Sequence, residues 1–199
     1  LIFEIKKIGL KVDLNLKNES LFKDMSGSSK INILNNYFIF DFFINDNKIK
    51  ITRSKVRGKN FSIFFETLVT LSPFFEIEST IDIYKIDPKI FEQINYKKFF
   101  ENDNLIKKFN SRNQISYNGK RSKSNLIKNL TLELDLDYGR LFYLGKIYLS
   151  AGFLECRGDS TLTDEYPRIY FDCTVNITNK NQFFKKNFML KNFDDDPLN

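Results

Sequence analysis

The second half of the chain alternates apolar and polar residues with a period of two. Four leucines between positions 130 and 136 are separated by polar residues, and Ile169 to Ile177 alternates in the same way. A period of two places successive side chains on opposite faces of a β-strand. We therefore expect a sheet with one apolar face and one polar face. Seven positions of these runs are predicted to share the apolar face: Leu130, Leu132, Leu134, Leu136, Ile169, Phe171 and Val175.

The first half of the chain carries the same alternation, in runs joined by short turns. Asn45-Asp46-Asn47 and Ser72-Pro73 are typical turn sequences between two such runs. The polar stretch 20–30 is predicted to be a loop, and the basic stretch 55–60 is predicted to be a turn around Gly58. Strands that follow one another through short turns pair in an antiparallel manner, so we expect an antiparallel meander over residues 1–86.

The alternation stops between the two halves. Asp87 suits a helix N-cap and Pro88 the first helical turn, and Ile90, Phe91 and Ile94 share one helical face. The polar and basic residues that follow predict a loose loop with one brief strand, residues 114–117. We therefore expect a helical insert and basic loop over residues 87–128. Phenylalanines at 183, 184 and 188 predict a terminal helix.

These patterns together predict a mainly β chain. Its main element is a long antiparallel β-meander that forms a curved, groove-like sheet, with a short helical insert and a terminal helix. We divide it into residues 1–86, 87–128 and 129–199, as parts of one continuous architecture. Because the sequence starts within a strand pattern and without a methionine, we expect it to be a segment of a longer protein.

Composition suggests two candidate partners and excludes some kinds of catalysis. The net charge is +6, and basic residues cluster at 48–59 and 120–128, which suits nucleic acid or an anionic membrane surface. Most aromatic residues, such as Phe38 and Phe40, occupy apolar-face positions, which favours a packing role and leaves nucleic-acid binding as an alternative. The chain has no histidine, so Ser-His and Cys-His nucleophile pairs are excluded within it. With no glycine-rich phosphate loop either, we expect neither an enzyme nor a cofactor nor a metal site, the acidic run Asp194–Asp196 included.

The two cysteines are expected to be neighbours. If the chain between them is a hairpin that turns at Asp164-Glu165, then Cys156 and Cys173 lie directly opposite each other on the apolar face. Two interpretations follow from this position. The pair forms either two buried thiols or a cross-strand disulfide, and the disulfide requires an oxidising compartment.

The block from Ile127 to Asn187 resembles the AsmA-like envelope proteins of Gram-negative bacteria, a group that includes the TamB-type proteins. Its order is strand, glycine turn, strand, short strand, proline turn, strand and phenylalanine-rich helix. The matching features are Tyr138-Gly139, Gly158-Asp159, Glu165-Tyr166-Pro167 and Phe183-Phe184-Lys185-Lys186. The helical insert that begins at Asp87-Pro88 is also similar to that family.

This resemblance implies a lipid-binding function without catalytic residues. It implies a β-groove that lies in the periplasm and is anchored to the inner membrane through other parts of the parent protein. The apolar interior would contact phospholipid acyl chains and aid phospholipid transport and outer-membrane biogenesis. The pattern of residues leaves a second fold open, a closed β-sandwich that buries the apolar face on itself and acts as a structural or interaction module. Binding to nucleic acid is the third hypothesis, and we do not expect it.

Overall fold

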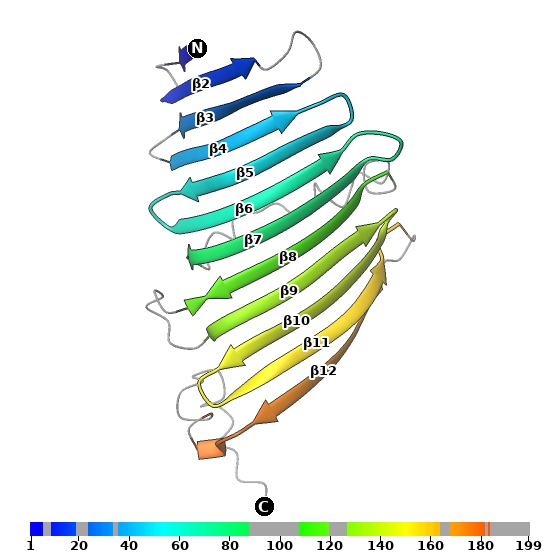
Figure 1. The fold of residues 1–199 in the computed structure, drawn as a ribbon. Coiled ribbons are helices and arrows are strands. Elements are labelled where there is room, and N and C mark those ends of the chain that lie inside the picture. Colours follow the sequence, from blue (N-terminus) through cyan, green and yellow to red (C-terminus); the bar gives the residue numbers. More distant parts are fainter. Residues whose placement is uncertain are drawn as a thin grey trace, which may run out of the picture.

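Twelve strands form one open sheet in which the spatial order of the strands equals their order in the chain (Figure 1). The computed structural model describes residues 1–5, 9–18, 24–33, 36–87, 108–119, 127–163, 168–181 and 183. The strands are β1 (Ile2–Ile5), β2 (Leu10–Asn18), β3 (Met25–Ile33), β4 (Asn36–Ile44), β5 (Lys48–Arg57), β6 (Phe61–Thr70), β7 (Glu76–Ile86), β8 (Asn110–Asn118), β9 (Ile127–Asp137), β10 (Arg140–Leu149), β11 (Gly152–Thr161) and β12 (Ile169–Ile177). The mainly β fold expected from the sequence is confirmed.

One pair of strands departs from the expected all-antiparallel meander. The strands β7 and β8 are parallel, with Ile77 opposite Ser111 and Ile81 opposite Ile115. Parallel neighbours need a connection of about a dozen residues or more, because the chain must return to the end at which the first strand began. The chain between β7 and β8 is long enough for this return, whereas every tight turn in the sheet joins antiparallel strands. The expectation of an entirely antiparallel sheet was therefore wrong at this pair.

Strand β3 occupies most of the stretch that the sequence predicted to be a polar loop. Its small residues fit closely against the neighbouring strands. A Cβ atom added at Gly27 would lie 2.3 Å from the Asn15 carbonyl oxygen and 2.8 Å from Cζ of Phe42. Ser29, opposite Phe40, is 2% exposed. Backbone pairing on both sides outweighs the weak strand preference of glycine and serine, which is why the loop prediction was wrong.

Strand β5 also runs further than predicted, because a bulge lies within it. Its register against β6 shifts between Ile51 and Ser54, and Arg53 has a φ of 49°. Ser54 is 2% exposed, and its hydroxyl accepts a hydrogen bond from the Phe65 amide at 3.0 Å. A bulge inserts an extra residue without ending the strand. The basic residues expected in a turn therefore lie within β5, up to Arg57.

The turns that the sequence identified are formed by residues suited to them. The Asn45 side-chain oxygen accepts hydrogen bonds from the amides of Asn47 and Lys48, at 3.1 and 2.7 Å. Tyr138 and Gly139 both have positive φ, 45° and 91°, as a two-residue hairpin turn requires. These local interactions set the register between the strands that they join.

The segment between the two predicted meanders contributes a strand of its own. Strand β8 is longer than the brief strand expected at 114–117, and it pairs with both β7 and β9. It therefore joins the two halves into one sheet. The helices expected over residues 88–107 and the basic residues at 120–126 lie outside the described residues. Of the predicted terminal helix, residues 180, 181 and 183 are helical, with the Phe183 amide donating to the Asn179 carbonyl at 2.9 Å.

The described residues form a single layer. Only Leu136, Ala151 and Phe183 are buried apolar residues among them. No second sheet packs on the first within the described part of the chain. A single layer of this kind does not form the closed β-sandwich that the sequence left open.

Candidate apolar binding face

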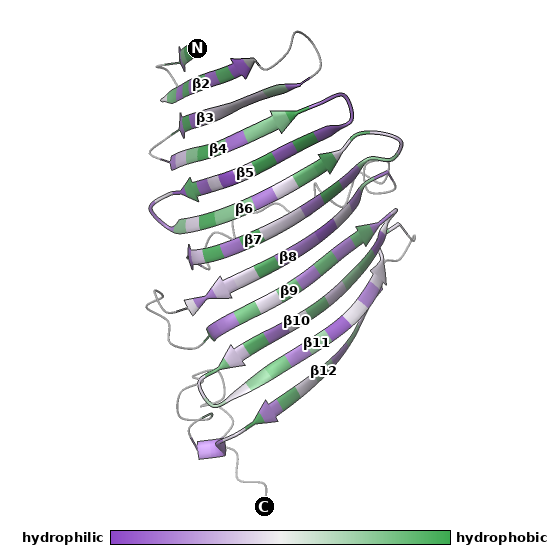
Figure 2. Ribbon diagram, viewed as in Figure 1, coloured by the Kyte–Doolittle hydropathy of each residue, from purple (hydrophilic) through white to green (hydrophobic). Residues whose placement is uncertain are grey.

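The register of the sheet brings the seven predicted apolar residues to one face. Leu134 is opposite Tyr143, Tyr143 is opposite Gly158, and Gly158 is opposite Phe171. Opposed residues in neighbouring strands point to the same side. We call this side the apolar face. The other strands contribute Phe3, Val12, Ile31, Phe38, Phe42, Ile51, Phe65, Ile81 and Ile115 to it. Figure 2 shows the alternation of hydrophobic and hydrophilic residues along the strands.

Exposure divides the seven residues into two groups. The leucines of β9 lie inside the sheet, and Leu136 is only 7% exposed. The residues of β12 lie at its edge, where Ile169 is 63%, Phe171 71% and Val175 54% exposed. An isolated exposed apolar residue is ordinary, but several that adjoin on one face suggest a binding surface. The β12 end of the apolar face is therefore its most accessible described part.

Three rows of side chains cross strands β9 to β12 on this face. The middle row is Leu132, Gly145, Cys156 and Cys173. The rows on either side are Leu130, Ile147, Leu154 and Val175, and Leu134, Tyr143, Gly158 and Phe171. A Cβ atom added at Gly145 would meet Cδ1 of Leu132 at 3.4 Å and no other atom closer than 3.9 Å. At β10 and β12 the middle row thus has smaller side chains than both neighbouring rows, whereas at β11 Cys156 lies between Leu154 and Gly158.

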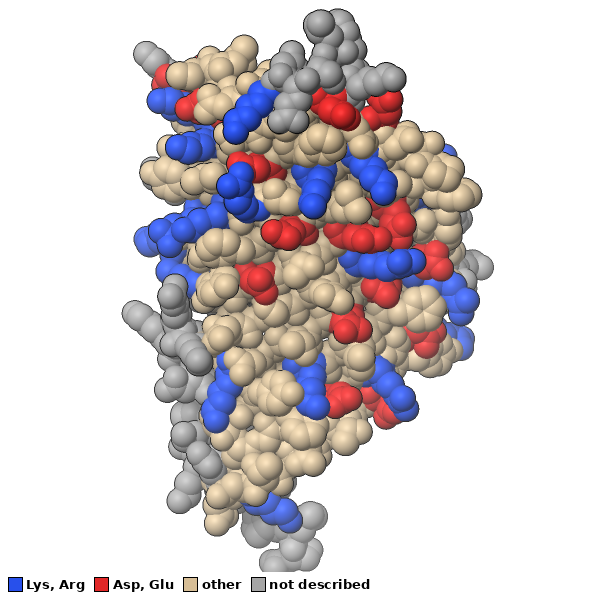
Figure 3. All heavy atoms as spheres, viewed as in Figure 1, with Lys and Arg blue, Asp and Glu red and all other residues tan. Residues whose placement is uncertain are grey.

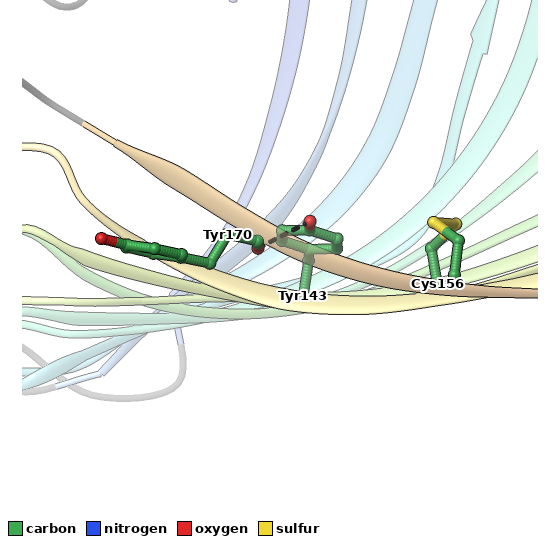
Figure 4. Close-up of a disulfide and its surroundings, with 4 residues drawn as sticks. Tyr143, Cys156 and Tyr170 are labelled. Carbon is green, nitrogen blue, oxygen red and sulfur yellow. Dashed lines mark hydrogen bonds between the residues drawn. A yellow bond between two sulfur atoms is a disulfide. The ribbon is translucent and has the colours of Figure 1, made fainter.

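The two cysteines of the middle row form a disulfide. Their Cα atoms are 4.1 Å apart, and they are directly opposed in the β11–β12 hairpin. Figure 4 shows the disulfide and the Tyr143 ring on the same side of the sheet. Between the two interpretations that the sequence left open, the structure has the cross-strand disulfide.

Tyr143 adds a contact that the sequence did not suggest. Its hydroxyl donates a hydrogen bond to the Tyr170 carbonyl at 3.0 Å, so the side chain reaches over β11 to β12 (Figure 4). Gly158 lies below it, where a Cβ atom would be 1.9 Å from the Tyr170 carbonyl oxygen and 2.5 Å from the Tyr143 hydroxyl oxygen. A glycine inside a strand often marks such a close approach. That signal was present at Gly158, but the partner could be found only once the register was known.

The opposite face carries charges of both signs. Figure 3 shows Lys and Arg side chains interleaved with Asp and Glu side chains over the middle of the view. Arg53 pairs with Asp41, Lys146 with Glu155 at 3.1 Å, and Arg112 with Glu76 at 3.5 Å. The hydrogen bond to Glu155 raises the pKa of Lys146 above its ordinary value. We call this side the charged face. Positive and negative side chains are therefore interleaved on the described part of this face.

The described residues of the basic clusters lie on β5 and at the start of β9. Lys50 and Lys55 lie on the charged face, and Lys50 lines a shallow depression together with Glu66 and Glu78. Lys128 donates to the Ser150 carbonyl at 3.5 Å. The other residues of the second cluster, and the acidic run 194–196, lie outside the described residues.

Neither a metal cluster nor a membrane-spanning helix occurs in the part of the chain that the structure describes. No three His, Cys, Asp or Glu residues gather there in a way that could hold a metal ion. No described helix has both the length and the apolar character needed to cross a bilayer.

Comparison with protein-family models, curated proteins and solved structures finds no match to this chain. The similarity to AsmA-like proteins therefore stays a hypothesis that rests on the turn, glycine and phenylalanine motifs of residues 127–187. The function proposed below therefore rests on the geometry of the sheet.

Proposed function

We propose that the apolar face binds the acyl chains of lipids across strands β9 to β12. The observation that carries this proposal is an open sheet whose apolar face no described element covers. Apolar surface of this extent is stabilised when something apolar removes it from water, and each buried methylene contributes about 0.8 kcal/mol. An acyl chain offers many methylenes and no polar group that would have to be paired.

The row of small side chains supports a linear ligand. A hydrocarbon chain that lies along Gly145, Cys156 and Cys173 would have larger side chains on both sides. These are Ile147, Leu154 and Val175 on one side, and Tyr143 and Phe171 on the other. Its path would run across the strands, in the direction in which the sheet continues from β9 to β12. This arrangement favours an extended chain over a compact ring system, because the row is one residue wide.

The test is a pair of variants on one strand. Leu134→Asp places a carboxylate on the apolar face, and Thr131→Asp places the same group on the charged face, where Thr131 is exposed. Binding is measured with a fluorescent long-chain fatty acid and by native mass spectrometry of the protein incubated with phospholipid vesicles. We expect Leu134→Asp to lose binding by at least tenfold and Thr131→Asp to retain it.

The same pair of variants distinguishes binding from folding. In a surface that water reaches, the new carboxylate at position 134 is hydrated, so the melting temperature should fall by only a few degrees. A sealed interior would leave the charge buried and unpaired, and the domain would unfold. Unfolding of Leu134→Asp, together with no lipid bound to the unmodified protein, would remove the proposal.

We extend the proposal to the setting that the AsmA-like resemblance implies. In this setting the chain is part of a periplasmic protein, anchored to the inner membrane through its parent, that aids phospholipid transport and outer-membrane biogenesis. The Cys156–Cys173 disulfide supports an oxidising compartment. Thiol labelling of the parent protein in intact cells tests this part separately. Two reactive thiols in the native, freshly isolated protein would contradict the periplasmic setting and leave the lipid-binding proposal intact.

A further inference from the structure

Strand β12 ends the sheet with an edge that lacks the usual protection. It has nine residues, and no described strand pairs with its outer side. Natural edge strands are commonly shortened, interrupted by proline or protected by lysine. Strand β12 contains neither proline nor lysine, and eight of its nine residues are exposed.

The disulfide identifies which backbone groups of β12 face outward. In an antiparallel pair, opposed residues about 4.5 Å apart do not exchange hydrogen bonds, whereas hydrogen-bonded pairs are about 5.5 Å apart. The Cα atoms of Cys156 and Cys173 are 4.1 Å apart, so the amide and carbonyl of Cys173 point away from β11. Alternation places the outward amides and carbonyls at Ile169, Phe171, Cys173 and Val175. The inward Tyr170 carbonyl, which accepts from Tyr143, agrees with this assignment.

The two faces beside this edge differ in chemistry. On the apolar face, Ile169, Phe171 and Val175 are more than half exposed. On the charged face, a depression of about 620 Å³ extends from β9 to β12. It is lined by four carboxylates, those of Glu133, Asp135, Asp159 and Asp172, and by one guanidinium, that of Arg157. Arg157 pairs with Asp172 at 3.3 Å, so the excess of negative charge comes from the other three carboxylates. Its charge is therefore negative, although the whole chain has a net charge of +6. The exposed rings of Phe142 and Tyr170 also line it.

We propose that the β12 edge accepts an extended segment of another protein in which apolar and basic residues alternate. Such a segment would add a thirteenth strand to the sheet through the outward amides and carbonyls of β12. Its apolar residues would extend the apolar face next to Phe171 and Val175. Its basic residues would lie on the charged face next to Tyr170 and Asp172. There they would contact the exposed Tyr170 ring and share the Asp172 carboxylate with Arg157, which lies 3.3 Å from it.

Charge disfavours a second copy of β12 as the occupant. Two β12 edges paired with each other would bring their two negative depressions side by side. The only charged residue of β12 is Asp172, so self-pairing would supply no cation to either depression. A segment with alternating basic residues supplies one cation at every second position.

The test uses a capped peptide of alternating lysine and valine, with fluorescence anisotropy as the readout. The matched control peptides have the same composition arranged in two blocks, and glutamate in place of lysine. Val175→Pro removes one outward amide, which an edge strand tolerates, and Val175→Ala shortens the same side chain but keeps the amide. We expect Val175→Pro to weaken binding by at least tenfold and Val175→Ala by less than threefold. Thermal melting checks that both variants fold.

A second pair of variants tests the charged side. Asp172→Asn removes an exposed carboxylate and also releases Arg157, its partner at 3.3 Å, beside the edge. Glu78→Gln removes one exposed carboxylate that lines the other depression, far from β12 in strand order. We expect binding to weaken by about fivefold for Asp172→Asn and to stay unchanged for Glu78→Gln. Equal binding of the alternating and block peptides, or full binding by folded Val175→Pro, would overturn the proposal. So would a dimer of the unmodified protein that Val175→Pro dissociates, because a second copy would then occupy the edge.

Discussion

Gly158→Ala tests whether the Tyr143 contact determines how β11 and β12 pack. The new Cβ atom would be 1.9 Å from the Tyr170 carbonyl oxygen, a distance that no Cβ atom tolerates, so the backbone of β12 must move. It would also be 2.5 Å from the Tyr143 hydroxyl oxygen and would displace that side chain from its 3.0 Å hydrogen bond.

The expected loss of stability follows from three contributions. Forcing extra atoms into a close-packed position costs about 1–3 kcal/mol. Loss of one hydrogen bond costs about 1 kcal/mol. Replacing glycine lowers the entropy of the unfolded chain, which offsets about 0.4–1 kcal/mol. We therefore expect the free energy of unfolding to fall by roughly 1–3.6 kcal/mol, and the melting temperature by roughly 2–14 °C.

Gly145→Ala is the matched control on the neighbouring strand. Its Cβ atom would meet nothing closer than 3.4 Å, so only the entropic contribution remains, and we expect stability to stay equal or rise by up to about 1 kcal/mol. The free energy of unfolding in urea is measured for both glycine variants, for Tyr143→Phe and for the double variant Gly158→Ala/Tyr143→Phe. The double variant should lose less free energy of unfolding than the two single variants together, because phenylalanine lacks the hydroxyl oxygen that the new Cβ atom would meet. Equal stability of Gly158→Ala and Gly145→Ala would refute this reasoning.

Three further predictions concern other contacts. Replacing Cys156 and Cys173 by serine opens a loop closed over a sequence separation of 17, and should lower the free energy of unfolding by roughly 3 kcal/mol in urea titrations. Ser54→Ala leaves the Phe65 amide without its 3.0 Å acceptor at a site that is 2% exposed, and should cost roughly 1–3 kcal/mol, whereas removal of an exposed hydroxyl by Thr178→Ala should cost little. The pKa of Lys146 is higher in the folded protein than its ordinary value of 10.5, so the charged Lys146 stabilises the fold at any pH below 10.5. This stabilisation is lost as the pH rises through the pKa of the folded state. The melting temperature of Lys146→Met should therefore depend less on pH in that alkaline range. An unchanged alkaline profile would show that the Glu155 contact does not contribute.

The sequence predicted the faces of the sheet better than its connections. Alternation along β9 and β12 is a local property, so it identifies which side chains share a face without knowledge of their partners. The parallel direction of β8 depends on where a long connection ends, and no residue of β8 encodes it. Strand β3 was missed because glycine and serine are typical loop residues. Only the register shows that Gly27 lies opposite Phe42 and Ser29 opposite Phe40.

The candidate site was predictable to the same extent. The sequence placed Leu134 and Phe171 on one face, but it gave no sign that Phe171 is 71% exposed at an edge whereas Leu136 is 7% exposed. Exposure depends on which strand is last in the sheet. The Tyr143–Tyr170 contact spans strands β10 to β12. Predicting it would have required the register of both the β10–β11 and the β11–β12 hairpins.

The equality of strand order and chain order has a consequence for how the sheet comes apart. Each strand pairs only with its predecessor and its successor, so stability is a sum of nearest-neighbour terms, as in repeat proteins. In such a structure the terminal strands can separate before the central strands do. At one end β1 has four residues, held to β2 partly by the Leu1 amino group, which donates to the Leu14 carbonyl at 2.7 Å. At the other end the disulfide ties β12 to β11 covalently. Within the described sheet, β12 should therefore separate from its neighbour later than strands that have no covalent tie.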